Sequence, residues 1–224
     1  MNLLLGVDDA GRGPVIGNMF LGGVLIDSEQ EAFLKEQNVK DSKLLSHPTR
    51  VRLSKIIEKN SIAHKVVSAT PEEIDHYVET NSLNTLEAMK MAEVIDFLKK
   101  KAGGKNKIEV VVDCPSINIS AWTEKLVGFV KNTEGLSIKC EHKADANHIS
   151  VSAASILAKV AREGNVEDIR KKIKINFGSG YPADPKVKEF LIKHGRKFEN
   201  SGIIRKSWGT WKAIVEKNGQ KKLF

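Results

Sequence analysis

The strongest constraint on the fold is a run of apolar residues at 3–7 that ends in two adjacent aspartates, Asp8 and Asp9. A turn rich in glycine and proline follows, and it leads into a second apolar run at 18–27. Short apolar runs bounded by turn residues are typical of β-strands. Two such runs joined by a turn predict a β-hairpin at the beginning of the chain.

Three more β-branched segments follow, and they alternate with helical patterns. The strand patterns lie at 61–68, 107–112 and 136–140. The helical patterns lie at 48–58, 71–79, 83–101 and 121–131, and the second of them opens with the helix-start signal Thr-Pro-Glu-Glu. A hairpin followed by β-α-β units predicts an α/β fold, with a five-stranded mixed sheet flanked by helices on both faces.

The pattern becomes wholly helical after Asp145. Helices are predicted at 151–163, 166–175, 186–194 and 207–216, with a turn at 178–184. The first of these helices carries the small residues Ala153, Ala154, Ser155 and Ala158, which indicate close packing against the sheet and not a site. We see no repeat or long linker, so we expect a sheet domain at 1–175 with a helical C-terminal region, 176–224, packed on it as a single structural unit.

Charge and cysteine content narrow the function classes. Lysine and arginine number 36 against 28 acidic residues, and a formal charge of +8 favours a polyanionic partner, although a basic surface can also serve solubility alone. The two cysteines, Cys114 and Cys140, are too few for a disulfide framework and indicate a reducing compartment. The apolar run at 3–5 is too short for a signal peptide or a membrane span, so we expect a cytoplasmic protein.

Aspartates stand where three of the predicted strands end. Asp8 and Asp9 end the first strand, Asp113 ends the fourth, and Asp145 follows the fifth. Strand ends at one edge of an open sheet with parallel neighbours form a crevice, so these carboxylates can converge. Converged carboxylates repel one another unless a cation neutralises them, and hard oxygen ligands select Mg²⁺ or Mn²⁺. Taken singly, each aspartate could instead be a turn former or a helix cap.

Residues 6–17, Gly-Val-Asp-Asp-Ala-Gly-Arg-Gly-Pro-Val-Ile-Gly, resemble the opening motif of the ribonuclease HII family. Further matching motifs follow in order: Lys40-Asp41-Ser42-Lys43, Val112-Asp113, His142-Lys143-Ala144-Asp145-Ala146, Val151-Ser152-Ala153-Ala154-Ser155, Ala158-Lys159-Val160-Ala161-Arg162, Gly178 to Pro185, and Arg205-Lys206-Ser207-Trp208. The resemblance spans residues 3 to about 215 and is greatest to the archaeal-like single-chain form. It implies a ribonuclease H-like fold with a helical C-terminal appendage.

By resemblance, four aspartates are catalytic and bind the metal: Asp8, Asp9, Asp113 and Asp145. Two Mg²⁺ or Mn²⁺ ions are expected during catalysis, one to activate a water and one to stabilise the leaving oxygen. The family usually has glutamate at the position of Asp9, and aspartate is one methylene shorter. We therefore expect activity with an altered metal preference. His142 and His148 are expected to be structural or surface residues, because the carboxylates suffice.

The resemblance also implies a set of substrate-binding residues: Gly11, Arg12, Gly13, Lys43, Lys143, Tyr181 and Arg205. The Gly-Arg-Gly turn would recognise the ribonucleotide and its 2′-OH through close backbone approach, with Arg12 also reaching the phosphate. Tyr181 would pack on the deoxyribose that follows. Lys43, Lys143 and Arg205 would contact phosphates. Without the resemblance, the same residues are a tight turn, a buried ring and solvated cations.

These inferences predict an endonuclease that acts on RNA/DNA hybrids and on DNA duplexes with embedded ribonucleotides. Hydrolysis at the phosphate 5′ of a ribonucleotide would leave 3′-OH and 5′-phosphate ends, with metal-bound water as the nucleophile. Two alternatives stay open: a non-catalytic module that binds hybrids on the same scaffold, and another two-metal nuclease or phosphotransferase of this fold. The sequence indicates no membrane association and leaves the protein partners unknown, and we expect a monomer.

Overall fold

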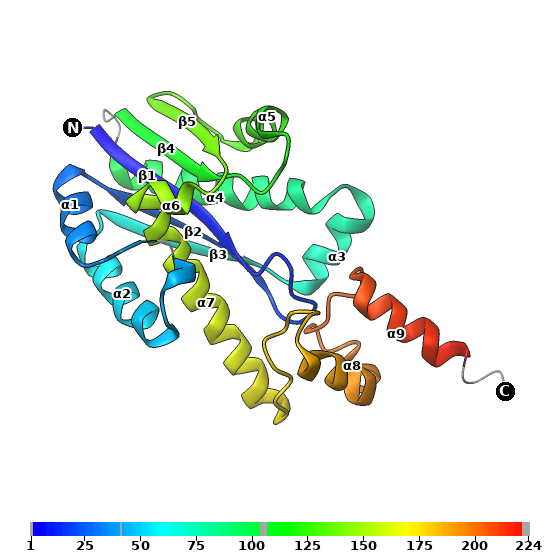
Figure 1. Cartoon of the computed structure of the whole chain (residues 1–224). Coiled ribbons are helices and arrows are strands. Elements are labelled where there is room, and N and C mark those ends of the chain that lie inside the picture. Colours follow the sequence, from blue (N-terminus) through cyan, green and yellow to red (C-terminus); the bar gives the residue numbers. More distant parts are fainter. Residues whose placement is uncertain (1, 41, 104–106, 221–224) are drawn as a thin grey trace. The chain divides into compact units, whose positions relative to one another are not determined.

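The structure is a computed structural model that describes residues 2–40, 42–103 and 107–220 (Figure 1). Asp41, part of one of the matching motifs, lies outside the described residues. Contacts divide the chain into two compact units. Unit 1 comprises Met1–Ala10, Phe20–Ser68 and Asn84–Ala161, and unit 2 comprises Gly11–Met19, Ala69–Leu83 and Arg162–Phe224. The domain division predicted at 175/176, with both parts in a single structural unit, stays a prediction.

The predicted strands form one mixed sheet, nearly all of it in unit 1. The strands are β1 (Asn2–Ala10), β2 (Met19–Ile26), β3 (Ala63–Ala69), β4 (Lys107–Asp113) and β5 (Leu136–Glu141), and they lie in the order β3-β2-β1-β4-β5. β1 is antiparallel to β2 and parallel to β4, and β4 is parallel to β5. The hairpin and the five-stranded mixed sheet are therefore confirmed.

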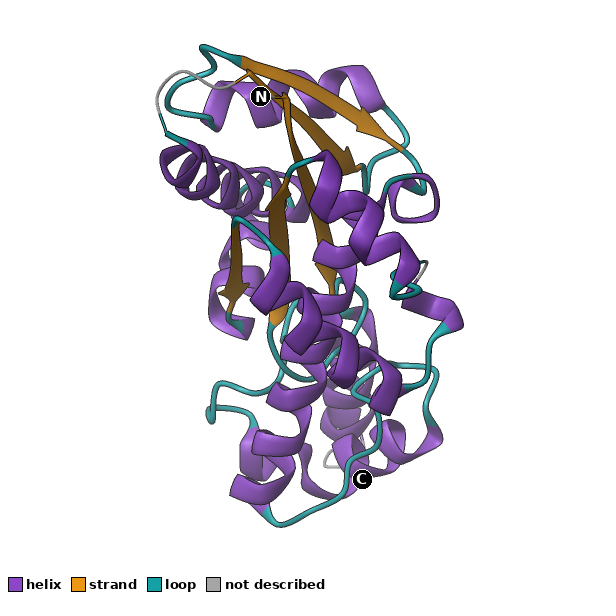
Figure 2. Cartoon of the chain, turned by 90° about the vertical axis from the view of Figure 1, so that its left-hand side faces the viewer, coloured by secondary structure: helices purple, strands orange, loops and turns teal. Residues whose placement is uncertain are grey.

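Two long helices cover opposite faces of this sheet. Successive residues of a strand point to opposite faces. A Cβ on Gly22 of β2 would clash with the backbone of α7 (Ile149–Ile173), and a Cβ on the next residue, Gly23, would clash with side chains of α4 (Leu83–Ala102). Glycine at both positions lets each helix approach closely, and Figure 2 shows helices on both sides of the strands.

The other helices are α1 (Ser28–Glu36), α2 (His47–Asn60), α3 (Pro71–Thr80), α5 (Ile119–Phe129), α6 (Ala144–Asn147), α8 (Pro185–Phe198) and α9 (Gly209–Gln220), with a 3-10 turn, η1, at Ser42–Leu44. One helix prediction was wrong, because the patterns at 151–163 and 166–175 belong to the single helix α7. Gly164 and Asn165 between them are weak helix formers, but both keep a backbone N–H, so the helical hydrogen bonds continue. In the described ranges, no helix combines the length and apolar character needed to cross a membrane.

Each unit has an apolar cluster of its own. In unit 1, residues of the sheet, α1, the loop after α1, α2 and α7 pack together: Val24, Ile26, Leu34, Val39, Leu53, Ile57, Ala153, Ala154, Ile156 and Leu157. In unit 2, the cluster is built from Val15, Ile16, Val166, Ile169, Phe177, Val187, Phe190, Leu191, Ile203, Ile204 and Trp211. Ala153 and Ala154 of α7 thus pack against the sheet as predicted.

Candidate active site

Three of the predicted aspartates meet in unit 1. Asp8, Asp113 and Asp145 each offer one carboxylate oxygen, and these oxygens lie within 4.8 Å of one another. Asp8 comes from β1, Asp113 ends the parallel neighbour β4, and Asp145 lies in α6 directly after β5. Parallel pairing carries the C-terminal ends of these strands to one edge of the sheet, which is why residues so distant in sequence converge.

A tight turn after β5 places Asp145 beside Asp113. Lys143 adopts the left-handed conformation with φ of 57°, which reverses the chain at the start of α6. The side chain of Lys143 does not cap this helix. Instead, the Ala144 N–H donates to Asp113 Oδ1 at 3.1 Å. The Ser152 hydroxyl donates to the carbonyl oxygen of Asp145 at 2.5 Å. The carboxylate of Asp113 therefore helps to fix the segment that carries Asp145.

Burial and like charge make the cluster electrostatically costly. Asp8 and Asp145 are buried, and Asp113 is half-buried. Burial raises the pKa of Asp8 well above its usual value, and the charges of Asp9 and Asp113 raise it further. Burial also raises the pKa of Asp113, and the charge of Asp145 adds to that rise. A cation among these groups would offset both effects.

The donor set fits a hard divalent cation. Within the described part of the chain, the buried Oδ1 of Asp145 has no hydrogen-bond partner. Its other carboxylate oxygen, Oδ2, lies 3.4 Å from Nζ of Lys43. Leaving a buried acceptor unpaired is costly, whereas carboxylate oxygens are the ligands that Mg²⁺ and Mn²⁺ prefer. The cluster is therefore a candidate metal site.

Asp9 is not part of the three-carboxylate group. It is the next residue of β1 after Asp8 and is half-buried. Its charge nevertheless contributes to the raised pKa of Asp8, so the two carboxylates interact. The role of Asp9 as a fourth metal ligand stays a prediction.

The two histidines near the cluster have other partners. His142 Nδ1 hydrogen-bonds with the Cys114 carbonyl oxygen at 3.2 Å, and His148 Nε2 lies 2.7 Å from Glu141 Oε1. Among the described residues, neither histidine belongs to the group that could hold a metal. These contacts agree with the structural roles expected for both.

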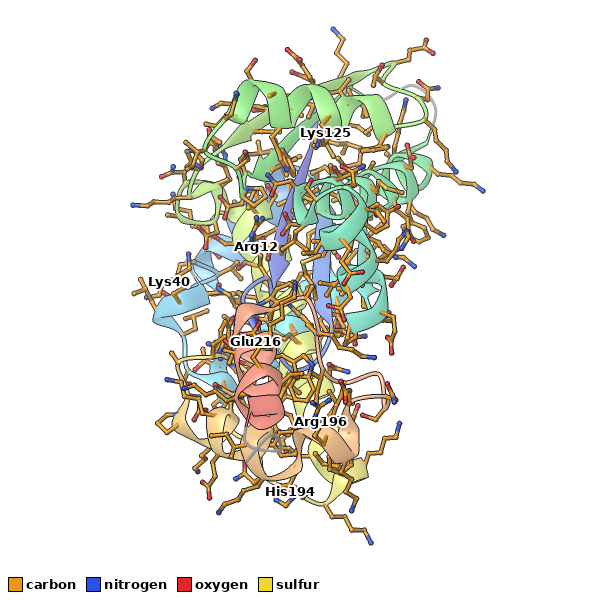
Figure 3. The ribbon with its side chains drawn as sticks, turned by 90° about the vertical axis from the view of Figure 1, so that its right-hand side faces the viewer. Arg12, Lys40, Lys125, His194, Arg196 and Glu216 are labelled. Atoms are coloured by element: carbon orange, nitrogen blue, oxygen red, sulfur yellow. The ribbon has the colours of Figure 1, made fainter. Side chains whose placement is uncertain are left out.

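In unit 2, the Gly-Arg-Gly turn follows β1, and Figure 3 labels its arginine, Arg12. Gly11 has φ of 90°, a conformation that favours glycine. The fully buried guanidinium of Arg205 donates to the carbonyl oxygens of Gly11 at 2.7 Å, Arg12 at 2.9 Å and Gly17 at 3.0 Å. These contacts hold the turn, and the expected phosphate contact of Arg205 stays a prediction.

Tyr181, also in unit 2, is held by neighbours and remains accessible. The guanidinium carbon of Arg162 lies 4.6 Å from the centre of the Tyr181 ring, and Arg162 also donates to the Ser179 carbonyl oxygen. A Cβ on Gly13 would lie 3.4 Å from the same ring, and the Trp208 indole N–H donates to the Gly13 carbonyl oxygen at 3.0 Å. Tyr181 is 39% exposed, so its ring is oriented and still available to a ligand.

The two lysines expected at phosphates lie in unit 1 and are exposed. Lys43 is next to the carboxylate cluster, with 65% of its side chain exposed. Lys143 lies in the turn before α6.

Some polar residues beside the cluster and the turn had no role predicted from the sequence. Ser42 and Lys159 in unit 1 and Arg162 in unit 2 were quoted only as members of matching motifs, and Ser155 was assigned to packing alone. A signal was present, since Ser155 and Lys159 are four residues apart and therefore share one face of α7.

Comparisons with known proteins agree over nearly the whole chain. A family model described as Ribonuclease HII matches residues 5–211. A protein named Ribonuclease HII from Methanosarcina acetivorans is 36% identical, over 98% of this chain and 100% of its own length. The crystal structure of the ribonuclease H2 from Pyrococcus horikoshii OT3 aligns with a TM-score of 0.84 and 34% identity, covering 96% of this chain and 98% of that one. The structure of the PCNA:RNase HII complex from Archaeoglobus fulgidus aligns with a TM-score of 0.79 and 32% identity, covering 94% of each chain. These alignments confirm the predicted ribonuclease H-like fold.

Proposed function

The chain belongs to the ribonuclease HII family and is an endoribonuclease of the ribonuclease H type, and on that premise we propose that it cuts at the phosphate 5′ of a ribonucleotide. Its substrates are RNA/DNA hybrids and DNA duplexes with embedded ribonucleotides, and its products carry 3′-OH and 5′-phosphate ends. The observation that carries the proposal is the meeting of Asp8, Asp113 and Asp145 within 4.8 Å.

Asp8, Asp113 and Asp145 would hold the divalent cations, Mg²⁺ or Mn²⁺, with Asp9 as a further ligand and two ions present during catalysis. Such ions, when bound, polarise the phosphate and make a water nucleophilic at neutral pH. The chain itself orients the carboxylates, as the Ala144 N–H does for Asp113 Oδ1. Lys43, 3.4 Å from Asp145, adds a positive charge at the edge of the cluster that suits a substrate phosphate.

Selection of the ribonucleotide is assigned to the Gly-Arg-Gly turn of unit 2. Because Arg205 fixes the carbonyl groups of Gly11 and Arg12, the turn presents one backbone conformation. A preformed set of backbone groups discriminates strongly between a sugar with a 2′-OH and one without it. Tyr181, oriented by Arg162, would pack on the deoxyribose that follows the ribonucleotide.

A protein partner is also part of the proposal. The relative from Archaeoglobus fulgidus forms a complex with PCNA, and it shares 32% identity with this chain over 94% of both. We expect this chain to co-elute with PCNA on gel filtration. We also expect it to act in the cytoplasm.

A DNA duplex with one ribonucleotide tests the cleavage reaction. With Mg²⁺ we expect a single nick with a 3′-OH and a 5′-phosphate end, and a chelator should abolish it. Asp113→Asn should reduce cleavage at least about a thousandfold, or ~4 kcal/mol of activation free energy. The matched control is Asp168→Asn, an exposed aspartate of α7 in unit 2, which should cut as the wild type does. A wild-type chain that bound the duplex without cutting it would establish the non-catalytic alternative.

A further inference from the structure

A line of polar side chains in unit 1 leads from a lysine to Asp8. Ser42 of η1 and Ser155 of α7 are fully buried, and their hydroxyl oxygens lie 2.8 Å apart. The ammonium of Lys159 donates to the Ser42 hydroxyl oxygen. At the other end, the Ser155 hydroxyl hydrogen-bonds to the Asp8 carboxylate. We call Lys159, Ser42, Ser155 and Asp8 the polar relay.

Donor and acceptor chemistry gives the polar relay a single direction. An ammonium group only donates, an ionised carboxylate only accepts, and a hydroxyl donates one hydrogen. With Asp8 ionised, as it would be beside a divalent cation, the hydrogen of Ser155 is committed to Asp8, so Ser42 donates to Ser155 and accepts from Lys159. Each hydroxyl therefore donates and accepts, and such chains strengthen their hydrogen bonds by mutual polarisation.

Asp8 is also held from its own backbone. The Asp9 N–H donates to Asp8 Oδ1 at 2.7 Å. With this bond and the bond from Ser155, the carboxylate is fixed from two directions in a buried position. Groups that hydrogen-bond to a metal ligand set its orientation, and their removal weakens metal binding.

Close packing alone does not require these residue types. Alanine at 42 and 155 would fill nearly the same volume, and burying a hydroxyl without a partner costs free energy. Ser42 and Ser155 have no solvent exposure, Lys159 is half-buried, and hydrogen bonds join the three side chains into one connected set. That set ends on one of the three carboxylates of the candidate metal site.

We propose that Ser155, Ser42 and Lys159 are positioning residues that orient Asp8 for a divalent cation, with Lys159 acting through Ser42. The effect of these residues on the rate of cleavage rests on the proposed function. None of the three residues needs to touch the cation or the substrate. Their effect is on how tightly the cation is held.

Calorimetric titration of the whole chain with Mn²⁺ tests the inference without measuring cleavage. Ser42→Ala interrupts the relay in its middle, and Lys159→Met removes its cationic end. Each should raise the Mn²⁺ dissociation constant about tenfold, the lower end of what loss of an outer hydrogen-bond partner costs a metal site. The double variant should bind about as weakly as the weaker single variant, because both changes interrupt the same relay.

The matched control is Ser54→Ala, a buried serine of α2 whose hydroxyl donates to the Val51 carbonyl oxygen. It should leave the Mn²⁺ affinity unchanged. Thermal unfolding in chelator shows which variants fold. Lys159 is only half-buried, so Lys159→Met provides the test if Ser42→Ala does not fold. In cleavage assays, excess Mn²⁺ should restore the rate of Ser42→Ala, since the loss lies in cation binding.

Mn²⁺ affinities equal to that of Ser54→Ala would overturn the inference and leave the polar relay a structural feature. So would a wild-type chain that does not bind Mn²⁺. A wild-type chain that binds Mn²⁺ tightly but leaves the ribonucleotide duplex intact would instead overturn the proposed function, while weaker binding by Ser42→Ala and Lys159→Met would still support the relay.

Discussion

Two buried polar regions of this molecule differ in how their polar groups are paired. In the carboxylate cluster of unit 1, three acids lie within 4.8 Å, burial and like charge raise the pKa of Asp8 and Asp113, and Asp145 Oδ1 has no partner among the described residues. In the turn of unit 2, the buried guanidinium of Arg205 meets three carbonyl oxygens at 2.7 to 3.0 Å. A bound cation would offset the electrostatic cost of the cluster, whereas hydrogen bonds within the chain already hold the turn. We infer that the cluster gives up stability in favour of cation binding, and that the turn is preorganised.

The largest stability effect is expected at Arg205. Arg205→Met should lower the free energy of unfolding by at least about 3 kcal/mol, because it leaves the carbonyl oxygens of Gly11, Arg12 and Gly17 without their donor, at roughly 1–3 kcal/mol each. Urea denaturation measures this loss. The control, Arg196→Met, removes an exposed arginine of α8 and should stay within about 0.5 kcal/mol of the wild type. Equal losses in the two variants would mean that the turn is not held by these bonds.

A smaller effect is expected at Tyr181, where the turn meets an accessible ring. Tyr181→Ala should lower kcat/KM about tenfold on a duplex with one ribonucleotide, since a stacked ring contributes roughly 1–3 kcal/mol. It should change cleavage of an all-RNA strand less, because there a 2′-OH disturbs the packing. Tyr181→Phe keeps the ring and should cut as the wild type does. If Tyr181→Ala slowed both substrates equally, the ring would not be selecting the junction.

Removing a charge from the cluster should stabilise the chain, whereas removing Arg205 from the turn should destabilise it. The pKa of Asp113 in the folded chain is raised above its usual value of 3.8. Its contribution to the free energy of unfolding is therefore fully present below pH 3.8 and is lost as the pH rises through the raised pKa. In chelator, wild type should therefore lose stability relative to Asp113→Asn as the pH rises from about 4 to neutral. Urea denaturation at several pH values checks this, with Asp168→Asn as the control for loss of one charge. A difference in stability between wild type and Asp113→Asn that did not change with pH would contradict the electrostatic cost of the cluster.

The smallest effect is expected from Lys43, at the exposed edge of the cluster. Lys43→Gln should weaken duplex binding in chelator a few-fold and reduce the slope of log affinity against log salt by about 0.9, the value of one phosphate contact. Lys35→Gln, on the exposed surface of α1, should leave the slope unchanged. An unaltered slope in Lys43→Gln would remove Lys43 from the set of phosphate contacts.

Local sequence patterns predicted the cluster well. Apolar runs mark strands, aspartates at their ends mark an edge of the sheet, and parallel pairing brings those ends together. The missed helix α1 shows where such patterns fail. Its one buried residue is Leu34, so it carries no apolar stripe, and only the capping box of Asp27 and Gln30 marks its beginning.

Long-range polar contacts could not be predicted in the same way. Arg205 donates to a carbonyl group 188 residues away, and the two serines of the polar relay are 113 residues apart. An arginine or a serine in isolation is most often at the surface, and only the folded chain shows which of them is buried against which partner. The sequence alone therefore did not show that Arg205 is buried in the turn or that Ser155 hydrogen-bonds to Ser42.

Anomalous scattering from crystals grown with Mn²⁺ tests the central claim most directly. The account predicts a peak among Asp8, Asp113 and Asp145, with a carboxylate oxygen of each at about 2 Å, and no peak there in Asp113→Asn at the same Mn²⁺ concentration. A wild-type crystal that bound Mn²⁺ only elsewhere, under conditions in which the chain cuts its substrate, would contradict it.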